Sequence, residues 1–274
     1  MTVVDRYKHG SFCWAELGSP EPAVTTRFYS ALFDLGIHHG KGYTILRKQG
    51  RDVVAIHRMP ADREARGEKP YWLLHVNVDS IDRAVARVEP RGGRVIVPPR
   101  EVYDAGRVAV LEDPSGAHLA LWQAVGHAGA GLIDEPATMC WWELNTRDAD
   151  EAGVFYSDVI GWRRAEKSVD AATRYTDFFV GERKVGGMLQ MNEAWGGMPS
   201  HWMTYFRVED CDEGAALAEK LGGAILVAPC DIPPVGRFAV VSDPHGGIFS
   251  IVAYGQAGRG SPPERGLTAI GRSE

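Results

Sequence analysis

The chain lacks a long apolar run, a cluster of basic residues and closely spaced cysteines, and each absence excludes a class of protein. No uninterrupted apolar stretch approaches the length of about 18 residues that a membrane-spanning helix needs. The segment MTVVDRYKHG has no apolar centre of the kind found in secretion signals, so we expect a cytoplasmic protein. A formal net charge of −6 without a basic stripe argues against nucleic acid as a partner.

The four cysteines lie far apart, and none forms a Cys-x-x-Cys pair. We therefore expect reduced, packed thiols rather than disulfides. Tryptophan, in contrast, is abundant at eight residues. Because an indole ring is costly to leave without burial or stacking, this number predicts an aromatic core, an aromatic binding surface, or both.

The sequence repeats itself once. The turn DPSG at 113–116 reappears as DPHG at 243–246, an offset of 130 residues. Nearer the N-terminus the offset is 127 residues, because CWAEL at 13–17 corresponds to CWWEL at 140–144. Further matches at the same offsets indicate a tandem duplication of about 127–130 residues.

Each half contains two copies of a smaller β-α-β-β-β unit. The first unit shows strand patterns at 11–19, 43–48 and 53–59 and helical spacing over 22–36, and a similar order begins again at residue 71. Two domains follow from this organisation, with a linker between them and a Gly/Pro/Ser-rich tail that we expect to be disordered. The boundaries are 1–124 for the first domain, 125–137 for the linker, 138–254 for the second domain and 255–274 for the tail.

Two motifs resemble the vicinal oxygen chelate superfamily, which includes glyoxalase I, bleomycin-resistance proteins and extradiol dioxygenases. One is a Phe-Tyr pair in the helix, at Phe28-Tyr29 and Phe155-Tyr156, and the other is the Asp-Pro-x-Gly turn before the last strand of each half. The resemblance covers residues 10–254. It implies an α+β fold of four βαβββ modules in two tandem glyoxalase-like domains, whose curved sheets form troughs that hold the substrate.

Metal-using members of this family place ligands at positions that carry unsuitable residues here. The Glu expected four residues after the Gly of each turn is replaced by Ala120 and Ser250, and the first-strand positions hold Phe12, Leu73, Met139 and Met203. A hard divalent cation needs about three or four converging imidazole or carboxylate groups. We therefore expect no metal and no other cofactor. The alternative is a displaced metal site made by Glu16, His57, His75 and His118.

Strand alternation predicts which side chains face the troughs, because every second residue of a strand lies on one face. We count alternate residues from the positions at which metal-using members of the family carry their ligands. The side chains predicted to face each trough are then mostly aromatic or methionine, with a few polar groups. The predicted ligand contacts in the first half are Phe12, Trp14, His75, His118 and Trp122. Those in the second half are Met139, Trp141, Glu143, Met203, Tyr205, Arg207 and Ser250, with Trp195 in a lid loop. Trp72, Trp142 and Trp202 fall on the opposite, core-facing side.

Glu16, His75 and Glu143 are the candidate catalytic residues. Glu16 and Glu143 occupy equivalent positions of the repeat, in the middle of a strand and on its trough face. A buried carboxylate without a partner would have a raised pKa and act as a base. A partner would make it structural, and the candidates are Arg207 for Glu143 and His75 for Glu16. Imidazole titrates near neutrality, so His75 is also suited to acid–base work.

Two further equivalent residues, Arg107 and Arg237, lie at strand entrances. They either anchor an anionic group or form salt bridges at the rim of the trough.

The function favoured by these observations is a metal-independent binding protein of the glyoxalase/bleomycin-resistance type. It would hold a bulky aromatic small molecule, such as a natural product or antibiotic, for sequestration or delivery. One alternative is a lyase, isomerase or hydroxylase-like enzyme that uses a trough carboxylate or histidine. A metal-dependent glyoxalase or dioxygenase is the third. The chain could work as a monomer or a homodimer, because one chain already builds two troughs.

Overall fold

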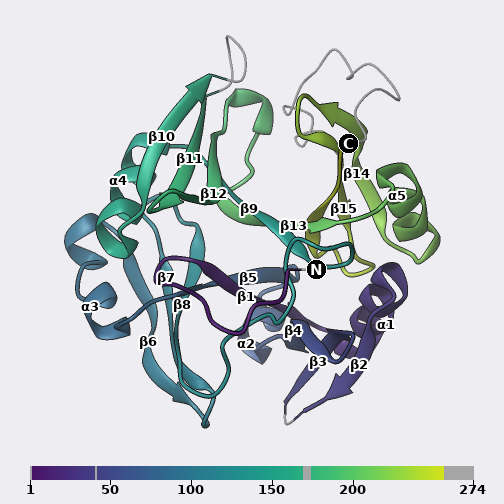
Figure 1. Cartoon of the computed structure of the whole chain (residues 1–274), viewed down its shortest axis with the longest axis horizontal. Coiled ribbons are helices and arrows are strands. Elements are labelled where there is room, and N and C mark those ends of the chain that lie inside the picture. The colour runs from purple at the N-terminus through teal and green to yellow at the C-terminus, as the bar shows by residue number, and fades with distance from the viewer. Residues whose placement is uncertain (1, 41, 169–173, 256–274) are drawn as a thin grey trace.

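Two eight-stranded mixed sheets, one in each half of the chain, organise this computed structural model (Figure 1). The structure describes residues 2–40, 42–168 and 174–255. The predicted tail therefore lies almost wholly outside the described residues. Among the residues described, no helix is long and apolar enough to cross a membrane.

The first sheet has the strand order β2-β3-β4-β1-β5-β8-β7-β6. Two βαβββ modules meet at its centre, where β1 pairs antiparallel with β5. The strands are β1 (Phe12–Ser19), β2 (Gly36–His39), β3 (Tyr43–Lys48), β4 (Arg51–Arg58), β5 (Tyr71–Asn77), β6 (Arg94–Val102), β7 (Gly106–Glu112) and β8 (His118–Ala124). The helices are α1 (Pro22–Phe33), α2 (Ala61–Ala65) and α3 (Ile81–Val85), with a 3₁₀ turn η1 at Glu89–Arg91.

The second sheet repeats this arrangement in the order β10-β11-β12-β9-β13-β16-β15-β14. Its strands are β9 (Met139–Thr146), β10 (Arg163–Ser168), β11 (Arg174–Val180), β12 (Arg183–Gln190), β13 (His201–Arg207), β14 (Ala224–Ile232), β15 (Gly236–Ser242) and β16 (Ile248–Tyr254). The helices are α4 (Ala149–Ile160) and α5 (Cys211–Lys220), with a 3₁₀ turn η2 at Glu193–Trp195. The α+β architecture of four βαβββ modules in two tandem domains is thus confirmed, and the modules pair in chain order.

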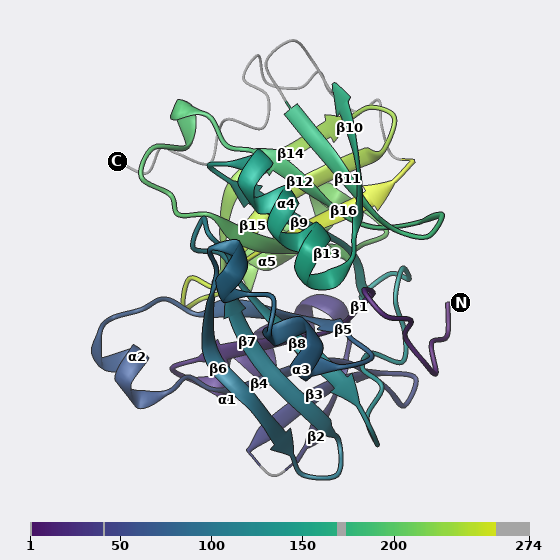
Figure 2. The ribbon, with the colours of Figure 1, turned by 90° about the vertical axis from the view of Figure 1, so that its left-hand side faces the viewer.

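Helices from the two halves lie side by side at the domain interface. Helix α1 contacts α5, and α3 contacts α4, on opposite sides of the molecule (Figure 1). Figure 2 shows the two sheets one above the other, and one cluster of buried apolar side chains contains residues of both halves. The core is therefore shared between the two domains.

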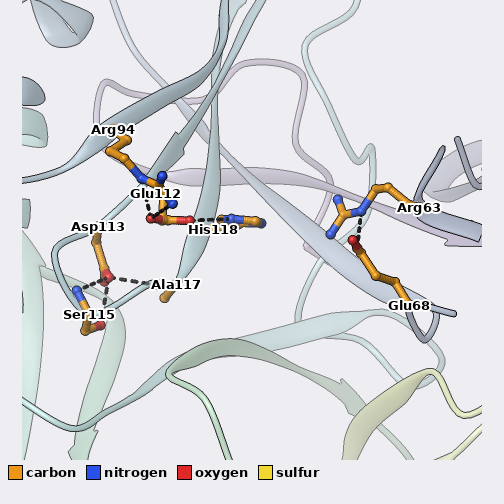
Figure 3. Close-up of polar contacts among 8 residues, drawn as sticks. All are labelled: Arg63, Glu68, Arg94, Glu112, Asp113, Ser115, Ala117 and His118. Atoms are coloured by element: carbon orange, nitrogen blue, oxygen red, sulfur yellow. Dashed lines mark hydrogen bonds and ion pairs between the residues drawn. The ribbon is translucent and has the colours of Figure 1, made fainter. Parts of the chain in front are cut away.

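The repeated motifs hold this interface together. Tyr29 of α1 donates a hydrogen bond to Asp243 of the second half at 3.4 Å, and Tyr156 of α4 donates to Asp113 of the first half at 2.9 Å. Asp113 also accepts from the backbone N–H groups of Ser115 and Ala117 within its own turn (Figure 3). Each turn aspartate therefore ties its own turn to a helix of the other half, and the Phe-Tyr and Asp-Pro-x-Gly motifs are structural.

Phe12 faces the domain interface and not the trough, contrary to the sequence prediction. The pairing of β1 with β5 shifts between Phe12 and Trp14, so that Trp14 lies opposite His75 while Phe12 lies opposite Val76. This β-bulge interrupts the alternation on which the prediction relied. Phe12 is 2% exposed, and its ring stacks on that of Trp142 with the centroids 5.0 Å apart.

The prediction that Met139 faces the second trough is wrong for the same reason. The pairing of β13 with β9 shifts in the equivalent place, so Trp141 lies opposite Tyr205 while Met139 lies opposite Phe206. Met139 is fully buried in the shared core. Trp72, Trp142 and Trp202 are buried in that core as predicted.

Candidate functional site

A cavity of about 480 Å³ lies in the trough of the first sheet. The sheet curves so that its two ends face each other, and β3 and β6 both contribute to the walls. The lining residues are Trp14, Glu16, Gly40, Tyr43, Ile45, Ala55, His75, Arg100, Val102, Tyr103, Asp104, Ala105, Val108, Val110, Trp122 and His127. A space of this size suits a small organic ligand.

Two tryptophans form fixed walls of this cavity. The indole Nε1 of Trp122 donates to the carbonyl oxygen of His127 at 2.9 Å. The imidazole ring of His127 packs edge-on against Trp14, with the ring centroids 4.9 Å apart, and its Nε2 lies 3.3 Å from Asp52. These contacts hold both indoles in place before any ligand enters.

Glu16 and His75 are among the polar residues that line the cavity, and His57 lies beside Glu16. Oε1 of Glu16 lies 3.9 Å from Nε2 of His57 and 3.9 Å from Nε2 of His75. These separations exceed hydrogen-bond length. The buried Nδ1 of His75 has no hydrogen-bond partner among the described residues. Glu16 and His75 therefore retain hydrogen-bonding capacity that a ligand can use.

Burial lowers the pKa of His75 below its usual value of 6.5, although the nearby Glu16 carboxylate partly opposes this shift. His75 is consequently neutral at pH 7. In the unfolded chain its imidazole takes up a proton more readily than in the folded protein. The contribution of His75 to folding stability is therefore fully present above pH 6.5 and falls as the pH drops below that value.

This linkage predicts the behaviour of a His75→Gln variant. Its free energy of unfolding should fall less than that of the wild type between pH 7.5 and pH 5.5, measured by urea unfolding at each pH. His201, whose pKa burial also lowers, contributes in the same direction, so His201→Gln is a matched comparison. Identical pH dependence of the wild type and both variants would contradict the assignment of buried neutral imidazoles.

In the equivalent trough of the second domain, the phenol groups of Tyr175 and Tyr205 occupy the space beside Glu143, and we call this the filled trough. Tyr205 donates to Oε1 of Glu143 at 2.9 Å, and Tyr175 donates to Oε2 at 2.8 Å. All three residues are buried. Burial raises the pKa of the Glu143 carboxyl group, and the two phenols only partly offset this effect. Glu143 is thus a structural carboxyl group enclosed by its own domain.

The other predicted contacts of the second half lie in or around this filled space. Met203 packs in a buried cluster with Tyr205, Ser250 is fully buried opposite Tyr205, and Trp141 donates to the Tyr175 hydroxyl at 3.1 Å. Trp195 is buried against Tyr175. Met203, Ser250 and Trp195 are buried and Trp141 is partly buried, so most of the side chains predicted to contact a ligand in the second trough contact other side chains of this domain.

Arg207 does not neutralise Glu143, contrary to one sequence interpretation. Its guanidinium group donates to the carbonyl oxygen of Asp134 at 2.8 Å and lies over the ring of Tyr254. The hydrogen-bond partners of Glu143 are Tyr175 and Tyr205 instead of Arg207.

His118 lies outside the residues that line the first cavity. Its Nε2 is 3.1 Å from Glu112, whose carboxylate also accepts from Arg94 (Figure 3). A separate ion pair in the same view, that of Arg63 and Glu68, belongs to the segment around α2 (Figure 3). Of the predicted contacts of the first half, the cavity therefore brings together Trp14, His75 and Trp122, with the catalytic candidate Glu16.

The two equivalent arginines form salt bridges, one of the two roles considered from the sequence. Arg107 pairs with Asp82 at 2.7 Å, and Arg237 pairs with Asp212 at 2.7 Å and with Asp231 at 3.0 Å. Each one ties its strand to the helix beside it.

The side chains present do not fit a divalent metal ion. Within residues 2–40, 42–168 and 174–255, no group of three or more His, Cys, Asp or Glu residues could hold one. The family positions carry Ala120 and Ser250, and both residues are fully buried. The displaced set also fails, because His118 is turned to Glu112.

Sequence reasoning missed several residues that line the cavity, among them Tyr43, Arg100, Tyr103 and His127. Tyr43 and Arg100 come from the outer strands β3 and β6, whose approach depends on the curvature of the sheet. His127 belongs to the segment taken as a linker, where Ala130 N–H donates to the carbonyl oxygen of Cys13 at 2.8 Å. That segment packs back onto β1, and no local sequence pattern signals this.

Comparison with known proteins gives the family. The model of the glyoxalase/bleomycin resistance protein/dioxygenase superfamily matches residues 12–121 and 133–250. The chain is 38% identical over 252 residues to a Mycobacterium tuberculosis protein named "Putative glyoxylase CFP32", covering 90% of this chain and 95% of the relative. It is 32% identical over 262 residues to the anthracycline biosynthesis protein DnrV of Streptomyces peucetius, covering 90% and 94%. In fold it is similar to the Mn(II)-bound glyoxalase of Novosphingobium aromaticivorans, with a TM-score of 0.63, 15% identity and coverage of 90% and 82%.

Proposed function

Because the chain belongs to the glyoxalase/bleomycin resistance protein/dioxygenase superfamily, we propose that it binds a flat aromatic small molecule in the first trough. The cavity of about 480 Å³ lined by Trp14 and Trp122 is the observation that carries the proposal. Fixed indole walls favour an aromatic ligand, because stacked rings gain more than their buried area alone provides. The second domain contributes the other half of the shared core and a trough that its own side chains fill.

The relatives support an aromatic ligand of more than one ring. A protein that shares 32% identity across almost the whole chain is named for anthracycline biosynthesis, and anthracyclines are polycyclic aromatic compounds. We propose a ligand of this general kind, held for sequestration or delivery. The binding is proposed to be independent of metal, since the donor set does not fit a divalent ion.

Alanine substitution of Trp14 tests this proposal. In titration calorimetry with naphthalene- and anthracene-sized compounds, Trp14→Ala should weaken binding by about 30-fold, as expected for a central aromatic contact. Trp141, its counterpart in the repeat, lies in the filled trough, so Trp141→Ala is the matched control and should keep the wild-type affinity. Failure of every compound to bind, or weakening by Trp141→Ala alone, would exclude the first trough as the binding site.

An acid–base enzyme is the second candidate, favoured by Glu16 and His75, which both line the cavity and lie 3.9 Å apart. Neutral imidazole and carboxylate groups at one site can exchange protons with a bound substrate. Mass spectrometry of a bound compound after incubation tests this alternative. Conversion of the compound that stops in Glu16→Gln and His75→Gln would favour catalysis over binding alone.

A further inference from the structure

Glu16 and Glu143 are the same position in the two halves, and the strand register extends this equivalence to their neighbours. Glu16 lies opposite Ala55 on β4, as Glu143 lies opposite Gly187 on β12. On β3, Tyr43 lies two residues before Ile45, which pairs with Ala55. On β11, Tyr175 lies two residues before Asp177, which pairs with Gly187. Tyr43 is therefore the counterpart of Tyr175.

The same comparison pairs His75 with Tyr205. His75 lies opposite Trp14 on β1 and Ala120 on β8, and Tyr205 lies opposite Trp141 on β9 and Ser250 on β16. One half therefore carries a phenol at the position where the other half carries an imidazole.

In the second domain the carboxyl group of Glu143 is satisfied by two phenol hydroxyl groups. Tyr205 donates to one oxygen and Tyr175 to the other, at 2.9 and 2.8 Å. The two phenol rings are buried in the trough. This half thus contains a complete example of a trough carboxyl group that binds hydroxylated aromatic rings.

In the first domain the same carboxyl position has no such donor. Among the described residues, no hydrogen bond joins Glu16 to Tyr43, and Nε2 of His75 is 3.9 Å from its carboxylate. Glu16 and His75 instead line the cavity. Where the second half has the Tyr205 ring bonded to Glu143, the first half has the Glu16 carboxylate facing a cavity.

We propose that the ligand supplies the missing hydroxyl group: an aromatic ring bearing a phenolic OH enters the first trough and donates to Glu16. The proposal rests on the aromatic-binding function inferred above and defines its ligand class. Ligands that carry a carboxylate at this point are disfavoured, because their negative charge would meet that of Glu16. A hydrogen bond to a charged acceptor is strong enough to select a hydroxyl group over an ether of the same size.

Titration calorimetry with 2-naphthol and 2-methoxynaphthalene tests the proposal, because the two probes differ in the ability to donate. The wild type should bind 2-naphthol about 10-fold or more tightly than the ether. Glu16→Leu should bring this ratio close to one, and the better-tolerated Glu16→Gln should reduce it. Glu143→Gln, in the filled trough, is the matched control and should leave the ratio unchanged.

The outcomes separate this proposal from the broader one. Equal affinity of the wild type for the two probes would overturn the hydroxyl contact and leave aromatic binding standing. A preference for 2-naphthol that persists in both Glu16 variants would also overturn it, since Glu16 would not be the acceptor. Absence of binding by either probe would overturn both proposals.

Discussion

Replacing His75 with tyrosine should close the first cavity and abolish binding of aromatic probes. His75 occupies the position of Tyr205, whose phenol fills the second trough and donates to Glu143. A phenol placed in the first trough should make the same bond to Glu16 and take the space of the ligand. We expect 2-naphthol to bind at least about 100-fold more weakly, because the ligand loses both the space it would occupy and the free carboxylate that would accept its hydrogen bond.

The stability of this variant provides the second measurement. Since the new ring fills empty space and satisfies an acceptor, the melting temperature should stay the same or rise. His75→Gln is the control, because it leaves the cavity open and should retain most of the affinity. Unchanged binding of 2-naphthol by His75→Tyr would show that the two troughs are not interchangeable in this way.

Replacing Phe12 with alanine should give the opposite result, a large loss of stability with unchanged ligand affinity. The Phe12 ring lies among Trp142, Trp162 and Trp202, with centroids 5.0, 5.4 and 5.1 Å away. Removing a buried phenyl ring costs about 3–5 kcal/mol, because a cavity remains. For a chain of this length the melting temperature should fall by on the order of 10 °C.

Urea unfolding and probe titration of the same variant test both parts of this prediction. Val125→Ala is the control for stability, since Val125 is 76% exposed and its truncation should have little effect. A Phe12→Ala protein that stays stable but loses affinity for 2-naphthol would place Phe12 in the trough. That result would mean that residues of β1 alternate regularly up to Phe12, without the register shift between Phe12 and Trp14.

Much of the fold can be predicted from the sequence because its organisation is repetitive. The matches at offsets of 127 and 130 residues define the halves, and the Asp-Pro-x-Gly turns mark the final strands. Alternation places Trp14, His75 and Trp122 correctly, because these residues lie on regular parts of their strands. It fails at Phe12 and Met139, where a bulge adds a residue that no local pattern reveals.

The difference between the two troughs depends on contacts that are distant in sequence. Tyr175 reaches Glu143 from a strand 32 positions away, and Tyr205 from one 62 positions away. Whether these rings fill the trough is decided by sheet curvature and strand register. The sequence therefore predicts two aromatic troughs with different lining residues but does not show which of them has room for a ligand, whereas the structure has a cavity in the first trough and two phenols against Glu143 in the second.

The reciprocal bonds of Tyr29 with Asp243 and of Tyr156 with Asp113 also bear on how this protein evolved. A half-length ancestor would carry one such tyrosine and one such aspartate, and could join both only by pairing with a second copy around a two-fold axis. In that dimer every substitution would alter both troughs at once. Fusion of the two copies would remove this constraint, so that the equivalent positions could differ, as His75 and Tyr205 do. The half with the filled trough still contributes to the core, because the main hydrophobic cluster contains buried residues of both halves.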